Sequence, residues 1–249
     1  MSADCPRFKV VIPARFASTR LPGKPLINIL DKPMIEWVHQ AAQASQAEQV
    51  IVATDDDRII RAVKAFGGNC CKTRSDHETG TDRIVEVSEL MGWSDDVVIV
   101  NLQGDEPLMP AQNLTQVAAN LIGSGLEMAT LHKHIDAHSA DDPNLVKLVV
   151  DHQGRALYFS RSKIPFDRDT GESGYFGHIG LYAYRVGFLK TYASLQPCML
   201  ELSEKLEQLR ALYYGYRIHS ELAAQTPGIG VDTEQDLLQV SAQLRALQG

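Results

Sequence analysis

The sequence predicts an α/β fold: an open, mostly parallel sheet with helices on both faces and an inserted antiparallel lobe. Short apolar runs alternate with stretches of helical periodicity through the first half of the chain, which is the pattern of a parallel sheet covered on both sides. After about Asp141 this alternation gives way to hairpin-like spacing. No internal repeat, low-complexity tract or long linker interrupts the sequence, so we expect a single domain over residues 1–249.

Five apolar runs in the first half have the composition of buried strands. They cover residues 9–12, 50–53, 69–72, 97–102 and 128–131. Between these runs, apolar side chains recur at helical spacing over residues 33–47, 56–66, 81–91 and 111–122. Because strands that are apolar on both faces need cover on both sides, we expect these helices to pack on the two faces of the sheet.

The second half begins with a predicted hairpin, in which residues 145–150 and 156–160 flank a turn at 152–154. A loop rich in glycine and aspartate, residues 167–177, leads to the remaining elements. These are expected at residues 179–184 (strand), 186–195 and 203–214 (helices) and 218–221 (strand). The last helix starts at Thr233, in a segment that resembles a capping box, and runs to Leu247.

Composition excludes several classes of protein. The 249 residues carry a net charge of −7, and no basic face is recognisable, which argues against a nucleic-acid partner. No apolar run approaches about 18 residues and the N-terminus lacks the apolar core of a signal peptide, so we expect a cytoplasmic protein without a membrane partner. The cysteines lack C-x-x-C spacing, which indicates free thiols rather than a zinc site; they are Cys5, Cys70, Cys71 and Cys198.

A basic loop follows the first strand. In the segment KVVIPARFASTRLPGK (residues 9–24), Arg15, Arg20 and Lys24 alternate with alanine, serine and glycine. Small residues let backbone N–H groups approach an anion, and the cations supply its counter-charge. The spacing matches neither G-x-x-x-x-G-K-[ST] nor G-x-G-x-x-G. The loop therefore predicts a site for a phosphate chain; a surface loop with three solvated cations is the alternative.

Two acidic segments are candidates for a metal site. Asp105 and Glu106 belong to the segment NLQGDEP (residues 101–107), which directly follows the apolar residues 97–100, and ligands of open α/β sheets bind at the carboxyl ends of strands. A carboxylate beside a polyphosphate usually holds Mg²⁺; a solvated turn is the alternative. Asp232 ends the glycine-rich segment PGIGVD, and its carboxylate is explained equally by a metal and by the start of the last helix.

Three further polar features flank predicted elements. The segment from His77 to Arg83 precedes a helix and is rich in small and hydroxyl residues, so it either wraps a base or ribose or caps that helix. Arg161 and Arg168 flank a bend, and His178 precedes a strand. Because arginine offers a bidentate fork to a carboxylate, the two arginines suggest an acidic co-substrate; scattered surface arginines are the alternative.

Together these segments resemble one family. The motifs occur along the chain in the order VIPARFASTRLPGKPL, ATD, RSDHETGTDR, NLQGDEP, NLVK, ALYFSR, HIGLYAYR, LEQLR and PGIGVDT. They are similar to those of the 3-deoxy-manno-octulosonate (Kdo) cytidylyltransferases, the CMP-Kdo synthetases of lipopolysaccharide biosynthesis, from about residue 8 to the C-terminus. The resemblance implies a fold like that of the nucleotide-diphospho-sugar transferases, with a nucleotide-binding half (8–131), a sugar-binding and dimerisation lobe (144–221) and a C-terminal segment (222–249).

The resemblance implies roles for individual residues. It places the CTP site at Ala14, Arg15, Ser18, Lys24, Ser75, Gly80, Thr81 and Gln103. It places the sugar-acid site at Gln103, Arg161, Arg168, His178, Tyr182, Glu207 and Gln208. Asp105 and Asp232 correspond to the family's Mg²⁺ ligands, and together with Arg15 and Lys24 they form the implied catalytic set.

The implied reaction joins CTP and Kdo to give CMP-Kdo and pyrophosphate, with the anomeric hydroxyl attacking the α-phosphorus in line. A homodimer is implied as well, and Tyr213, Tyr214 and Tyr216 form an aromatic group that suits either an interface or a core. The rivals are CMP activation of another 2-keto sugar acid, such as 8-amino-Kdo or a sialic acid, and a non-catalytic nucleotide-binding regulator. The chain departs from the family at Gly177, where a basic residue is common, and in its short loop 167–177.

Overall fold

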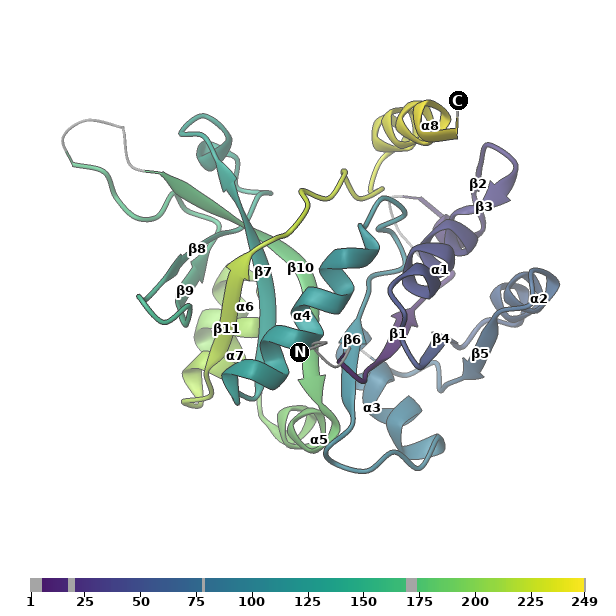
Figure 1. The fold of residues 1–249 in the computed structure, drawn as a ribbon, viewed down its shortest axis with the longest axis horizontal. Coiled ribbons are helices and arrows are strands. Elements are labelled where there is room, and N and C mark those ends of the chain that lie inside the picture. The colour runs from purple at the N-terminus through teal and green to yellow at the C-terminus, as the bar shows by residue number, and fades with distance from the viewer. Residues whose placement is uncertain (1–5, 18–20, 78, 169–173, 249) are drawn as a thin grey trace, which may run out of the picture.

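The structure, a computed structural model, describes residues 6–17, 21–77, 79–168 and 174–248, and within them nine strands form one sheet with helices on both faces (Figure 1). The strands are β1 (Lys9–Pro13), β4 (Gln49–Thr54), β5 (Asn69–Lys72), β6 (Val98–Asn101), β7 (Met128–Ile135), β8 (Lys147–Val150), β9 (Ala156–Ser160), β10 (Tyr175–Arg185) and β11 (Ile218–Leu222). Their order is β11-β7-β10-β6-β1-β4-β5, with β8 and β9 extending the sheet from β10. The predicted fold class is confirmed.

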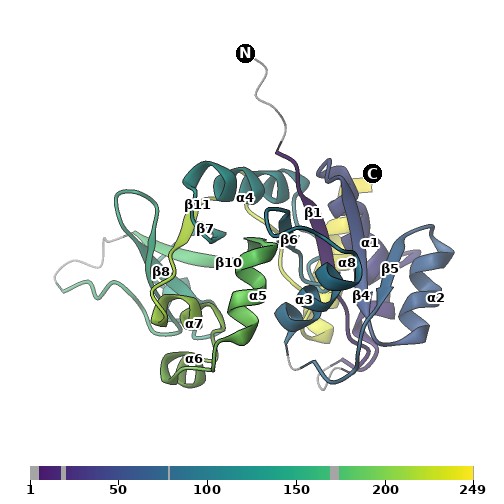
Figure 2. The same cartoon turned by 90° about the horizontal axis from the view of Figure 1, so that it is seen from below.

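The first half forms the parallel part of the sheet. Strand β1 pairs in parallel with β4 and β6, and β4 pairs in parallel with β5. Side chains alternate between two cores, so Val10 and Ile12 pack on one face of the sheet and Val11 on the other. The first face is covered by α1 (Met34–Ala44), α2 (Asp57–Ala65) and α4 (Ala111–Ser124). The second is covered by α3 (Gly80–Leu90), α5 (Val186–Ser194) and α7 (Gln208–Tyr213), as Figure 2 shows.

Strand β10 joins the two halves of the sheet. It runs antiparallel to both β6 and β7, and the β8–β9 hairpin pairs with its first residues, so the predicted antiparallel lobe is present. The strand predicted at 179–184 is longer, because β10 begins at Tyr175. The helix predicted at 203–214 is two helices, α6 (Met199–Glu204) and α7. Lys205 ends α6 with a left-handed backbone (φ 54°), which the helical spacing did not reveal.

The C-terminal helix α8 (Glu234–Gln248) packs beside the small hairpin of β2 (Asn28–Ile29) and β3 (Lys32–Pro33) (Figure 1). Val240 and Leu244 share a third core with Ile29 and Met34. Helix α8 therefore anchors the segment before it against the first half of the chain.

None of the helices within the described ranges combines the length and hydropathy needed to cross a bilayer.

Thr233 and Asp236 cap α8. The Asp236 N–H donates to Thr233 Oγ1 (3.2 Å), and the Thr233 N–H donates to Asp236 Oδ2 (2.8 Å), which forms the predicted capping box. The cap is thus Thr233 rather than Asp232. Of the two explanations that the sequence left open for Asp232, the start of the helix does not account for its carboxylate.

Two histidines, the buried His132 and the half-buried His178, lie on the paired strands β7 and β10. His132 shares a hydrogen bond with Ser220 (Nδ1–Oγ 2.9 Å), and His178 shares one with Thr130 (Nε2–Oγ1 2.9 Å). Burial, with a smaller contribution from His134, lowers the pKa of His132 to about 4. Burial, with a smaller contribution from His132, lowers the pKa of His178 to about 3. Both imidazoles are therefore neutral near neutral pH.

This neutrality makes stability depend on pH. Because the folded pKa of His132 lies below the unfolded value, only the unfolded state takes up this proton as the pH falls from about 6.5 toward 4. We expect the free energy of unfolding of His132→Asn to fall less steeply over this range than that of the wild type. The difference in slope should be up to about 1.4 kcal/mol per pH unit. Denaturant unfolding at several pH values measures this, with the exposed His152→Asn as control. An unchanged slope in His132→Asn contradicts a neutral buried imidazole.

Candidate functional site

The predicted site residues gather at the carboxyl edge of the parallel strands. Arg15 follows β1, and Gln103 and Asp105 follow its neighbour β6. A Cβ on Gly104 would lie 2.9 Å from the Pro13 carbonyl oxygen, so glycine is what lets these two loops meet. The segments that predict a phosphate site and a metal site are therefore neighbours.

Lys24 connects three segments that are far apart in the sequence. Its ammonium donates to Asp105 Oδ2 (2.6 Å) and Asp232 Oδ1 (3.1 Å). It also donates to the carbonyl oxygen of Val231 (2.9 Å), and its side chain is only 14% exposed. Burial alone lowers the pKa of Lys24, but the two carboxylates outweigh burial and the pKa is raised. A charged ammonium thus holds both carboxylates at one point of the site.

The carboxyl groups around Lys24 fit a divalent cation. Burial, and after it the charge of Asp105, raises the pKa of the adjacent Glu106 to about 8, so this carboxyl group is mostly protonated near neutral pH. Within the described ranges, no group of three or more His, Cys, Asp or Glu side chains forms a candidate metal centre. Asp105 and Asp232 alone suit Mg²⁺, which usually takes one or two protein carboxylates together with phosphate and water oxygens.

Arg15 presents an unsatisfied donor beside the same loops. Its Nη2 is buried and forms no hydrogen bond within the part of the chain that the structure describes. With Ala14, Lys24, Gly80 and Gln103, it lines a hollow of about 370 Å³, which we call the Arg15 hollow. A buried N–H group without an acceptor costs free energy. The hollow therefore suits an anion that accepts from Arg15.

A second buried arginine lies close to Arg15. The Arg83 side chain is 1% exposed and forms an ion pair with Asp55 (Nη2–Oδ1 2.9 Å). It also donates to the hydroxyl of Thr73. Burial lowers the pKa of Arg83, Asp55 raises it, and the nearby charge of Arg15 lowers it further. Asp55 thus pairs with Arg83 rather than with Arg15, whose Nη2 stays available to an anionic ligand.

The segment 77–83 caps helix α3. The Asp82 N–H donates to Thr79 Oγ1 (3.1 Å), and the Thr79 N–H donates to Asp82 Oδ2 (3.1 Å). The helix-cap alternative is therefore confirmed. Gly80 and Thr81, which follow the cap, still line the hollows of the site. Ser75 is exposed and lines none of the hollows named here.

A second hollow, of about 260 Å³, lies between α3 and α7, and we call it the Tyr182 hollow. Its polar lining includes Gln103, Glu207 and Gln208. Thr81 Oγ1 donates to Glu207 Oε2 (3.3 Å), which links the two halves of the chain. Burial raises the pKa of Tyr182 well above its usual range, so its hydroxyl remains a donor. These amide, carboxylate and hydroxyl groups suit a polyhydroxylated ligand.

A third hollow, of about 410 Å³, contains His178 and Lys133 in its lining, and we call it the His178 hollow. The three hollows share border residues. Asp105 and Asp232 line the Arg15 and His178 hollows, and Gly80 and Gln103 line the Arg15 and Tyr182 hollows. Gly180 lines the Tyr182 and His178 hollows. The three hollows are therefore compartments of one cleft that meet around the Gln103–Asp105 loop.

Two residues predicted for the sugar-acid site lie apart from this cleft. The Arg161 guanidinium donates to the carbonyl oxygens of Glu204 (2.7 Å) and Pro143 (3.0 Å), and Arg161 lines none of the three hollows. Arg168 is exposed and also lines none of them. Ser18 lies outside the described residues. Arg161 instead joins the end of β9 to the end of α6, just before the residues that line the Tyr182 hollow.

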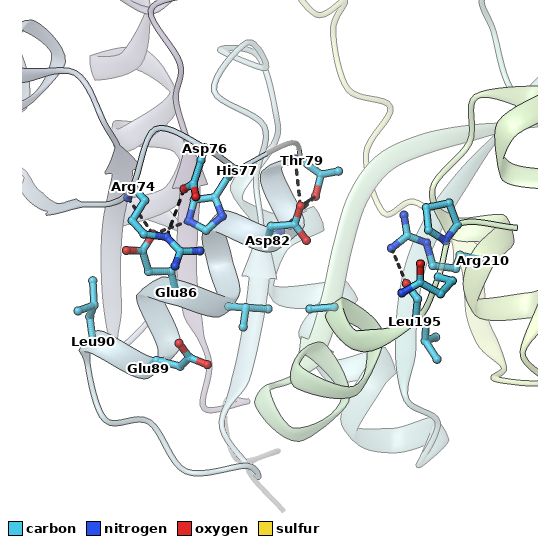
Figure 3. Close-up of a pocket in the computed structure, with 14 residues that line it drawn as sticks. Arg74, Asp76, His77, Thr79, Asp82, Glu86, Glu89, Leu90, Leu195 and Arg210 are labelled. Carbon is cyan, nitrogen blue, oxygen red and sulfur yellow. Dashed lines mark hydrogen bonds and ion pairs between the residues drawn. The ribbon is translucent and has the colours of Figure 1, made fainter.

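A larger hollow, of about 690 Å³, lies outside this cleft, between α3 and the segment after α5 (Figure 3). Its arginines and its histidine already have protein partners: His77 with Glu86, Arg74 with Asp76, and Arg210 with Glu201. It contains none of the residues that the family resemblance implies. Volume alone would favour this hollow as the functional site. The unsatisfied Nη2 of Arg15 and the converging carboxylates of Asp105 and Asp232 favour the cleft instead.

Sequence reasoning missed two residues of the cleft, Lys133 and Gly180, and the buried Arg83 close to Arg15. Arg83 was seen only as the end of a loop, because helical spacing does not reveal that its side chain turns inward. Lys133 lies beyond the strand predicted at 128–131, on a longer β7. Gly180 stands inside the predicted strand 179–184, where an isolated glycine is a recognised signal for a bulge or a close approach.

Comparisons with known proteins agree with this geometry. The family model described as "Cytidylyltransferase" matches residues 9–218. A relative from Vibrio vulnificus (strain YJ016), named 3-deoxy-manno-octulosonate cytidylyltransferase, is 52% identical over 238 aligned positions, which cover 92% of this chain and 95% of the relative.

Two solved structures are similar as well. A CMP:2-keto-3-deoxy-manno-octonic acid synthetase complexed with CTP superposes with a TM-score of 0.91 at 43% identity, over 96% of this chain and 99% of that one. A cytidylyltransferase from Leptospira borgpetersenii serovar Hardjo-bovis (strain JB197) shares the fold, with a TM-score of 0.64 at 15% identity, over 96% of this chain and 87% of that one. By the family match and this degree of identity, the chain belongs to the cytidylyltransferase family.

Proposed function

We propose that this protein transfers the cytidylyl group of CTP to Kdo, giving CMP-Kdo and pyrophosphate for lipopolysaccharide biosynthesis. The observation that carries the proposal is the contact of Lys24 with Asp105 and Asp232, where a hollow with an unsatisfied arginine meets two hollows lined by polar groups. The name of the 52% identical relative and the CTP in the similar solved structure support the choice of substrates.

The nucleotide is proposed to occupy the Arg15 hollow. Arg15 and Lys24 would bind the triphosphate, because one has a free buried donor and the other a charged ammonium. Gly80 and Thr81 would approach the cytidine from the start of α3, and Gln103 would face both substrates. The remaining residues of the proposed nucleotide set are Ala14, which lines the hollow, Ser75, which is exposed, and Ser18.

The sugar acid is proposed to occupy the Tyr182 and His178 hollows. Gln103, Tyr182, Glu207 and Gln208 would bind its hydroxyl groups. His178 would act as a neutral hydrogen-bonding group, because its lowered pKa keeps it uncharged. Arg161 and Arg168 stay in the proposal as carboxylate contacts, although the Arg161 guanidinium meets two carbonyl oxygens here.

Positioning and charge neutralisation account for the proposed reaction. The cleft would hold the anomeric hydroxyl in line with the α-phosphorus, while Arg15 and Lys24 offset the negative charge that develops on the leaving pyrophosphate. A Mg²⁺ ion held by Asp105 and Asp232 would neutralise phosphate oxygens and lower the pKa of the attacking hydroxyl. Direct attack by the sugar hydroxyl requires no covalent enzyme intermediate.

A pyrophosphate-release assay tests the proposed function. With CTP and Mg²⁺, we expect turnover with Kdo and less turnover, by at least about 10-fold in kcat/KM, with a sialic acid, because the second substrate must fit a compact polar site. A higher kcat/KM with 8-amino-Kdo or a sialic acid than with Kdo would show that the rival sugar acid is the substrate. Absence of pyrophosphate with every sugar acid, despite CTP binding, would favour a nucleotide-binding regulator.

The carboxylate pair gives a second prediction. We expect Asp105→Asn or Asp232→Asn to lower kcat by at least about 100-fold, because each removes a charge-stabilising group from the reaction centre. Asp57→Asn, which changes an exposed carboxylate outside the cleft, is the matched control and should keep wild-type turnover. If either cleft variant is folded and turns over like the control, the metal assignment is wrong.

We also propose that the chain works as a homodimer in the cytoplasm. Several large apolar side chains of the second half are exposed, and they are Leu157, Met199, Leu202, Tyr213 and Tyr214. We propose that the interface covers these side chains. Sedimentation should therefore give twice the mass of the 27.5 kDa chain; a monomer at assay concentration contradicts the dimer. The thiols of Cys70, Cys71 and Cys198 are free, as suits a reducing compartment.

A further inference from the structure

Gly180 stands at an irregular point of the central antiparallel strand. The register of β10 against β7 shifts between Ile179 and Tyr182. Thr130 Oγ1 lies within hydrogen-bond distance of the carbonyl oxygens of Ile179 (3.1 Å) and Leu181 (2.9 Å) and can donate to either, so the carbonyl oxygens on both sides of Gly180 face the same side chain. Irregular pairing of this kind re-aims a strand locally and is frequent beside active sites. It places Gly180 on the border of the Tyr182 and His178 hollows.

Neither packing nor backbone geometry requires glycine at this position. A Cβ on Gly180 would meet no heavy atom within 4 Å, and the residue does not have a left-handed backbone. Gly177, on the same strand, differs, because a Cβ there would lie 2.9 Å from Ile135 Cγ2. The space beside Gly180 is therefore open space in the cleft, and no other part of the protein fills it.

We propose that Gly180 is a specificity-determining residue, whose missing side chain keeps open the passage that the sugar acid occupies between the two hollows. This inference rests on the proposed function. The attacking hydroxyl must come close to Asp105 and Asp232, which line the His178 hollow, whereas Glu207 and Gln208 line the Tyr182 hollow. The Arg15 hollow also joins these two sets of groups, but the nucleotide is proposed to occupy it. A sugar acid that reaches both sets beside the nucleotide therefore passes the border at which Gly180 lies.

Substitutions at this position separate substrate space from protein stability. Alanine adds one methyl group at a compatible backbone conformation, so the melting temperature should be unchanged or higher. Valine adds more bulk and is favoured in strands. Because an added group in a fitted site is costly, we expect the KM for Kdo to rise about 10-fold in Gly180→Ala and about 100-fold in Gly180→Val. The Kd for CTP should stay within about twofold, since Gly180 does not line the Arg15 hollow.

Gly123→Ala is the matched control. Gly123 lies on α4, is exposed, and likewise has no heavy atom within 4 Å of a built Cβ. It lines none of the three hollows. The control variant should match the wild type in KM for Kdo and in Kd for CTP. Any loss that is specific to Gly180 then arises from the cleft and not from replacing a glycine.

The outcomes of this experiment are distinguishable. A graded rise in the KM for Kdo, with stability and CTP affinity kept, supports the inference. Wild-type KM values in both Gly180 variants would overturn it and leave the proposed function intact. An equal loss of CTP affinity would also overturn it, because Gly180 would then border the nucleotide. A wild-type protein that releases no pyrophosphate with any sugar acid would overturn the proposed function and this inference together.

Discussion

The contact of Lys24 with Asp105 and Asp232 is the interaction on which the rest of the site depends. It joins the loop after β1, the loop after β6 and the segment that leads to α8. Two carboxylates brought together without a cation repel each other, and partial burial strengthens that repulsion. Lys24 offsets it in the protein alone, and a divalent cation bound by the same oxygens would offset it further. The positions of Asp105 and Asp232 in the cleft thus depend on the positive charge between them.

The fold places this contact by simple rules. Parallel strands bring their carboxyl ends to one edge, so the loops after β1 and β6 meet there. Strand β10 reverses direction beside β6 and carries His178, Gly180 and Tyr182 to the same region from the second half. The chain therefore brings cationic groups from the loop after β1 and polar groups from β10 to the same acidic loop after β6.

Sequence patterns predicted the elements well where one physical signal was strong. The apolar runs located the parallel strands, and the motif after β6 located Asp105. The pattern did not predict that the Arg83 side chain is buried or that Lys205 interrupts the helix predicted at 203–214. Both features depend on tertiary contacts. Asp232 shows the limit most clearly. The sequence left its role open; the structure shows that Thr233 caps α8 and that the Asp232 carboxylate accepts from Lys24, which is distant in the sequence.

The most direct test of the account is a crystal structure with CTP, Mg²⁺ and a Kdo analogue that lacks the anomeric hydroxyl. The account predicts one ion ligated by Asp105 and Asp232, triphosphate oxygens on Arg15 and Lys24, and the sugar acid lying across Gly180. Density for the ion away from either carboxylate, or for the analogue in the hollow of Figure 3 between Arg74 and Arg210, would contradict it.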